Sequence, residues 1–82
     1  MTEMPFNSSE QAPGSPCVLA VNGQRQDVPI GSTALDVVRG LGLEGRPMAV
    51  EVNGRVVPRA DLGRCMLSSG DRLEVVTLVG GG

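Results

Sequence analysis

The chain has 82 residues, of which 40% are hydrophobic and 20% charged, and Phe6 is its sole aromatic side chain. This length allows one domain, which buries only about 60% of its unfolded surface and has little room for a deep active-site cleft. The formal charge of −2 comes from Glu3 and Glu10, because the seven acidic residues after residue 16 balance seven arginines. With neither a basic stripe nor aromatic stacking platforms, nucleic-acid binding has little support.

Residues 1–16 are rich in Ser, Pro, Gln and Glu and carry little to bury, so ordering them would cost backbone entropy without compensating contacts. We interpret them as a flexible leader to a domain over residues 17–79. They lack the basic start and apolar run of a signal peptide, and no stretch approaches the roughly 20 apolar residues of a membrane span. We therefore expect a cytoplasmic, reducing location and no membrane partner.

A hairpin is predicted first. The apolar run Val18–Val21 favours a short strand, and Asn22 and Gly23 form the pair that tolerates positive φ in a tight turn. Residues Gln24–Ile30 then read as the return strand. Its polar residues indicate that one face is wet.

A helix follows the hairpin. Residues 31–33 interrupt the strand and offer hydroxyl caps. Apolar residues then recur on one side at helical spacing, namely Ala34, Leu35, Val38 and Leu41. The pattern predicts a helix from about Thr33 to Leu41, with Gly40 and Gly42 both placed to end it in the left-handed conformation.

A second hairpin is predicted after the helix. Met48–Val52 is a strand closed by another Asn53–Gly54 turn, and Arg55–Val57 pairs back until Pro58 removes a ladder donor. Arg59–Leu67 is predicted to be connecting structure with one short helical turn.

The last strand is the most strand-like run of the chain, Leu73–Val79. Alternation puts Leu73 and Val75 on one face and Val76 and Leu78 on the other. If the helix covers the first face, Val76 and Leu78 lie where a partner could bury them.

This order of elements predicts an α+β fold. We expect a mixed sheet of four to five strands with one helix on one face, and the first and last strands parallel at its centre.

Catalytic constellations are missing from the sequence. Cys17 and Cys65 have no CxxC spacing and the chain has no histidine, so neither a zinc site nor a Cys/His pair can be assembled from it alone. We interpret both cysteines as small apolar filler. The chain also lacks a phosphate-binding loop before a helix, so we expect a protein cosubstrate without catalytic residues, bound cofactor or metal.

The chain ends in Gly80, Gly81 and Gly82. Glycine loses the most backbone freedom on ordering and packs nothing, which predicts a flexible tail. Without Cβ atoms such a tail can thread a narrow channel and bring its carboxylate to a nucleotide phosphate in another protein. ATP would make an acyl adenylate there, and a sulfur nucleophile would leave a thiocarboxylate. A frayed terminus without function is the alternative interpretation.

Four segments, spread over residues 18–82, form a recognisable set: Val21–Gly23, Ala49–Gly54, Val56–Arg59, and Gly70–Glu74 running on to Val79 and the glycines. Together they resemble the thiamine-biosynthesis sulfur carriers of the ThiS family, which have the ubiquitin-like β-grasp fold. The resemblance implies that Gly81 and Gly82 are the functional pair. It also implies that Gly82 is adenylated by a ThiF-type enzyme using ATP, receives sulfur from a desulfurase, and supplies thiazole synthase.

Other functions stay open at this point. Carriers of sulfur for molybdopterin, cysteine or tRNA thiolation share the activation chemistry, a ubiquitin-like modifier would form an amide through the same glycine, and a passive interaction module would leave the tail idle. Val76, Leu78 and Arg59 are the candidate partner-binding residues. Arg59 and Arg72 could steer an acidic surface of a partner, although lone surface arginines are usually only solvated; Arg59, after Pro58, is the better candidate of the two.

Overall fold

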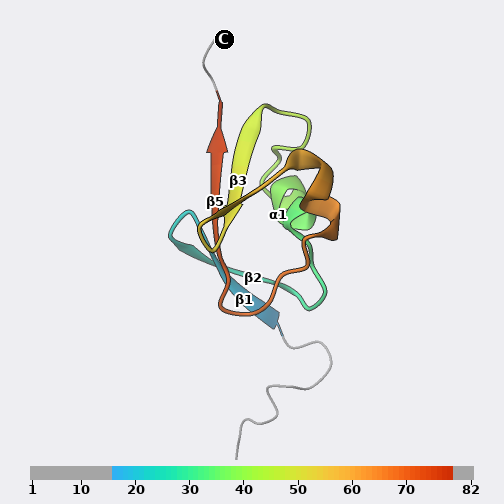
Figure 1. Cartoon of the computed structure of the whole chain (residues 1–82). Coiled ribbons are helices and arrows are strands. Elements are labelled where there is room, and N and C mark those ends of the chain that lie inside the picture. Colours follow the sequence, from blue (N-terminus) through green and yellow to red (C-terminus); the bar gives the residue numbers. More distant parts are fainter. Residues whose placement is uncertain (1–15, 79–82) are drawn as a thin grey trace, which may run out of the picture.

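A computed structural model describes residues 16–78. Its elements, in chain order, are β1 (Pro16–Val21), β2 (Gln24–Pro29), α1 (Ala34–Gly40), β3 (Met48–Val52), β4 (Arg55–Val57), the 3-10 helix η1 (Arg59–Arg64) and β5 (Arg72–Thr77). The strands form one sheet in the order β2-β1-β5-β3-β4. Helix α1 packs on one face of the sheet (Figure 1).

The predicted topology is confirmed. Strands β1 and β5 are parallel at the centre, and the pairs β1–β2, β3–β4 and β3–β5 are antiparallel. The mixed sheet with one α-helix on one face is the α+β, β-grasp arrangement. Several boundaries differ from the predictions by one or two residues: β1 begins at Pro16, β2 ends at Pro29, α1 spans Ala34–Gly40 and β5 spans Arg72–Thr77. Residues 1–15 and 79–82, with most of the predicted leader and the whole glycine tail, lie outside the described residues.

Both hairpins turn through an Asn-Gly pair with positive φ, as predicted. The φ angles are 51° at Asn22 and 82° at Gly23, and 52° at Asn53 and 85° at Gly54. Turns with positive φ at both central residues match the right-handed twist of the strands they join. The two strand pairs flanking β5 are therefore set by local backbone chemistry.

Helix α1 begins with a capping box. The Thr33 N–H donates to Asp36 Oδ2 over 2.9 Å, and the Asp36 N–H donates to Thr33 Oγ1 over 3.2 Å. These hydrogen bonds to Thr33 lower the pKa of Asp36. The prediction for Leu41 was wrong: it lies beyond the last helical residue and is 38% exposed, while Val37 is buried in its place.

The core lies between the sheet and α1. Its buried apolar side chains are Cys17, Leu19, Val21, Ala34, Val37, Val38, Val50, Leu62, Leu67, Leu73 and Val75. The predicted helical turn after Pro58 is η1, and its Leu62 enters the core. The pattern of the connecting segment did not indicate this burial, because a single leucine in a short turn carries no period.

Candidate functional site

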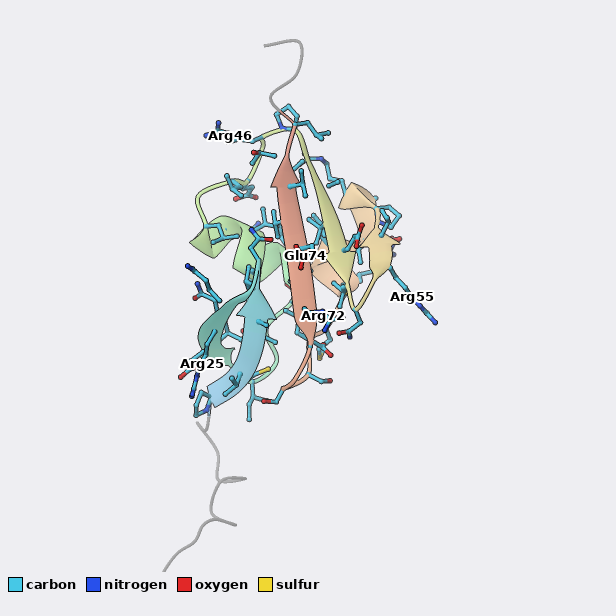
Figure 2. The ribbon with its side chains drawn as sticks, turned by 90° about the vertical axis from the view of Figure 1, so that its left-hand side faces the viewer. Arg25, Arg46, Arg55, Arg72 and Glu74 are labelled. Atoms are coloured by element: carbon cyan, nitrogen blue, oxygen red, sulfur yellow. The ribbon has the colours of Figure 1, made fainter. Side chains whose placement is uncertain are left out.

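Strand β5 is the structural base of the glycine tail. It lies between β1 and β3, and its last residue, Thr77, is followed by Leu78 at the end of the sheet opposite the start of β1 (Figure 1). Its side chains alternate as predicted: Leu73 and Val75 are buried, whereas Val76 is 55% exposed. Leu78 is 54% exposed. The view onto the uncovered face of the sheet, with α1 behind, shows Arg72 and Glu74 pointing from β5 (Figure 2).

Hydrogen bonds hold β5 along its whole length. The Asn53 N–H donates to the Arg72 carbonyl over 2.7 Å at one end of the pairing with β3. At the other end the Leu78 N–H donates to the Pro47 carbonyl over 3.0 Å. The chain is therefore held to the sheet up to Leu78, four residues before its last glycine.

The Asn22 side chain extends the pairing of β5 beyond the end of β1. Its Nδ2 donates to the Val75 carbonyl over 3.1 Å, and its Oδ1 accepts from the Val75 N–H over 2.8 Å. The amide thus replaces a strand residue in a partly buried setting. The sequence predicted Asn22 only as a turn residue, and the contact with Val75 was missed. The available signal was the side-chain amide of Asn, which can hydrogen-bond to the backbone of a neighbouring strand.

Asn53 holds the beginning of the same strand. Its Oδ1 accepts from the Arg72 N–H over 2.9 Å, and its Nδ2 donates to Asp71 Oδ1 over 3.0 Å. The other oxygen of Asp71 accepts from the Ser68 N–H over 2.8 Å. Both turn asparagines therefore position the strand that precedes the tail.

The Arg59 side chain reaches the end of the sheet at which Leu78 lies. Its Nη2 donates to the Arg46 carbonyl over 2.6 Å, and the next residue, Pro47, accepts from the Leu78 N–H. Figure 2 shows Arg46 at the same end of the sheet as the end of β5. The structure thus brings Arg59 and Leu78 to one end, with Val76 on the uncovered face nearby.

The two cysteines are free thiols. Cys17 is buried in the core. Burial, together with the charge of Asp71, raises the pKa of the Cys65 thiol. Cys65 therefore lacks the electropositive setting of a reactive thiolate.

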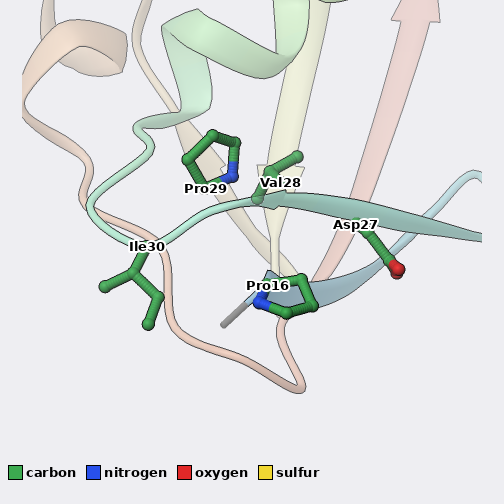
Figure 3. A pocket seen from close by; sticks show the side chains of 5 residues that line it. All are labelled: Pro16, Asp27, Val28, Pro29 and Ile30. Carbon is green, nitrogen blue, oxygen red and sulfur yellow. The ribbon is translucent and has the colours of Figure 1, made fainter. Parts of the chain in front are cut away.

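Two pockets border strand β2. One, of about 380 Å³, is lined by Pro16, Asp27, Val28, Pro29 and Ile30 (Figure 3). Its Asp27 carboxylate is paired with Arg25 over 2.9 Å, which leaves no base beside a nucleophile there. Another pocket, of about 270 Å³, is lined by residues of β2 and of α1 together with Leu41. Within residues 16–78, no three His, Cys, Asp or Glu side chains are grouped to hold a metal, and no helix has the length and hydropathy to cross a membrane.

Comparison with known proteins gives a consistent result. The sequence pattern of the ThiS family matches residues 19–82. The crystal structure of a thiamine biosynthesis protein (ThiS) from Geobacter metallireducens superimposes with a TM-score of 0.67 at 26% identity, covering 79% of this chain and 99% of that one.

Two curated relatives are named thiazole synthase. The one from Paramagnetospirillum magneticum is 33% identical over 64 residues, which are 78% of this chain and 20% of that protein. The one from Magnetococcus marinus is 37% identical over 62 residues, which are 76% of this chain and 19% of that protein. The chain thus spans about a fifth of the length of these relatives.

Proposed function

The chain belongs to the ThiS family, and on that premise we propose that it is a sulfur carrier for thiamine biosynthesis whose Gly82 carboxylate bears the sulfur. The observation that carries the proposal is the family match, which extends through the last glycine. The hydrogen bond of Leu78 to Pro47 supports it, because a partner that docks at this end of the sheet meets the residue that precedes Val79 and the glycines in the sequence.

The proposed reaction needs no catalytic group from this chain. A Gly82 carboxylate oxygen attacks the α-phosphorus of ATP, and pyrophosphate leaves. A sulfur nucleophile then attacks the acyl carbon of the adenylate, and AMP leaves. Sulfide gives the thiocarboxylate directly; a persulfide from a desulfurase gives an acyl disulfide, whose S–S bond a second thiol outside this chain must reduce. The chain's own cysteines are buried or protonated at neutral pH and take no part.

The length of the tail limits where the activating enzyme can bind. Four residues beyond Leu78 span at most about 14 Å when fully extended. An enzyme that holds the Gly82 carboxylate in its nucleotide site must therefore also contact this end of the sheet. Val76, Leu78 and Arg59 form the docking surface in this proposal, with the two aliphatic side chains to be buried by the partner.

Thiazole synthase is the proposed acceptor of the sulfur. In two proteins of that name a segment similar to this chain is part of the same polypeptide, which is expected if carrier and synthase act together. This favours thiazole formation over molybdopterin, cysteine or tRNA thiolation. The remaining partners are a ThiF-type adenylating enzyme, which uses the ATP, and a sulfur-donating desulfurase, and the proposed location is the cytoplasm.

Intact-mass measurement tests the proposal. The chain is incubated with a ThiF-type enzyme, ATP and a sulfur donor, and the expected product has one oxygen replaced by sulfur. Deletion of Gly82 should abolish the mass gain. A Cys17→Ala and Cys65→Ala double variant is the control and should gain the sulfur as the unchanged chain does. A mass gain in the Gly82 deletion, or none in the unchanged chain, contradicts the proposal.

A further inference from the structure

The uncovered face of the sheet carries two carboxylates directly opposite each other. The register of β3 and β5 pairs Glu51 with Glu74. Backbone hydrogen bonds join Asn53 to Arg72 and Leu78 to Pro47 in the same antiparallel ladder. Because bonded and non-bonded positions alternate along such a ladder, the backbones of Glu51 and Glu74 occupy a hydrogen-bonded position. The Cα atoms of such a pair are about 5.5 Å apart. Both side chains project on the side away from α1.

This arrangement is unfavourable in the free chain. Like charges directly opposite in a sheet destabilise it. The acidic side chains Asp27, Glu44 and Asp61 each pair with an arginine. By contrast, none of the ion pairs or side-chain hydrogen bonds within residues 16–78 includes Glu51 or Glu74, although Arg72 lies two residues before Glu74 on the same face.

Exposed aliphatic side chains border the carboxylate pair. Val56 of β4 is opposite Glu51 and 67% exposed. Val76 is opposite Ala49, in the neighbouring row of the sheet, and is more than half exposed. In the part of the chain that the structure describes, no element covers this face (Figure 2). The patch therefore has a negative centre that forms no ion pair within residues 16–78, and it has an apolar border. It adjoins Val76 of the docking surface.

We propose that the Glu51–Glu74 pair receives a cationic side chain, arginine or lysine, of the adenylating enzyme, which inserts between Val56 and Val76. A guanidinium can bridge two carboxylates with charge-assisted hydrogen bonds, and its aliphatic stem packs on the valines. The cation removes the repulsion that the free chain keeps, so the charge of the patch selects a basic partner. This inference rests on the proposed function and names the chemistry by which its activating enzyme is recognised.

A charge-matched pair of variants tests the inference. Glu51→Gln with Glu74→Gln removes the facing carboxylates and keeps their shape. The control, Glu44→Gln with Asp61→Asn, changes the net charge equally but removes carboxylates that already have arginine partners. Affinity for the adenylating enzyme is measured by calorimetry without ATP at low and high salt, and the thermal midpoint of each free variant is recorded.

The Glu51/Glu74 variant should bind about tenfold more weakly than the unchanged chain at low salt, and its binding should depend less on salt. Its thermal midpoint should be equal or higher, since the repulsion is gone. The control should bind as the unchanged chain does.

Equal binding by the Glu51/Glu74 variant overturns the inference, and so does an equal loss in the control, which would be a net-charge effect. Sedimentation that detects a dimer of the unchanged chain, lost on replacing Glu51 and Glu74, would assign the face to a second copy and its Arg72 instead. The mass gain at Gly82 is followed separately. A mass gain in the unchanged chain, together with equal binding by the Glu51/Glu74 variant, defeats the inference alone. No mass gain in the unchanged chain defeats the proposed function.

Discussion

The two faces of β5 differ although their residues alternate along one strand. Leu73 and Val75 are buried against α1 and the rest of the core. Glu74 and Val76 point from the other face, which within residues 16–78 has no covering element. Burial of the first face stabilises the folded state, because its apolar area is already out of water. The second leaves apolar area and charge unused by folding, which is what a partner needs for binding.

The largest effect is expected from equal substitutions on the two faces. Val75→Asn places an amide in the core, where the loss of apolar burial and an unpaired polar group together cost about 3 to 5 kcal/mol. At roughly 0.05 to 0.15 kcal/mol per residue, that is comparable to the whole stability of a domain this small. We expect Val75→Asn to be unfolded at room temperature by circular dichroism and thermal melting.

Val76→Asn is its matched control. Because Val76 is exposed, the stability should stay within about 0.5 kcal/mol, while adenylation of Gly82 falls as the docking surface loses an aliphatic contact. If Val75→Asn were folded and Val76→Asn unfolded, the assignment of Val75 to the buried face and Val76 to the exposed face would be wrong. Full adenylation of a folded Val76→Asn would remove Val76 from the docking surface.

A medium effect is expected from the asparagines that hold β5. Asn22→Gly keeps a residue that accepts positive φ but removes both hydrogen bonds to Val75, at a cost of about 2 kcal/mol in unfolding free energy. Asn53→Gly removes exposed hydrogen bonds to Asp71 and Arg72 and should cost about 1 kcal/mol or less. Urea denaturation measures both.

The entropy cost of a new glycine is common to these two variants, so their difference reports the hydrogen bonds. Equal losses would mean that the Asn22 amide stabilises β5 no more than the exposed Asn53 amide. Hydrogen exchange at Val75 should accelerate in Asn22→Gly and not in Asn53→Gly.

The smallest effect concerns the helix that covers the buried face. Hydrogen bonds to Thr33 lower the pKa of Asp36 below its usual 3.8, so the folded state favours the carboxylate. The stabilisation is complete above the unfolded-state pKa and is lost as pH falls through the lower folded-state pKa. Thermal midpoints of the unchanged chain should therefore fall more on acidification than those of Asp36→Ala. Parallel curves would show that the Asp36 carboxylate makes no pH-dependent contribution to stability.

Local chemistry made much of the fold predictable. Positive-φ Asn-Gly pairs located both hairpins, the Thr33 hydroxyl located the start of α1, and alternation assigned the faces of β5. Prediction failed where a residue's environment depends on distant elements. Leu41 fits the helical period yet follows the last helical residue, and Leu62 enters the core from a segment without a period.

By itself the sequence determined the elements and their turns, because each depends on φ preferences or periodicity over a few residues. The flexible tail over Gly80–Gly82 stays a prediction, outside the described residues. The tertiary structure alone decided which residues meet across the sheet. Asn22 reaches Val75 over 53 positions of the chain, and Glu51 faces Glu74 only because β3 and β5 pair in one register. A shift of one residue would turn every side chain to the other face, so the buried core, rather than any local preference, selects that register and with it the charge of the uncovered face.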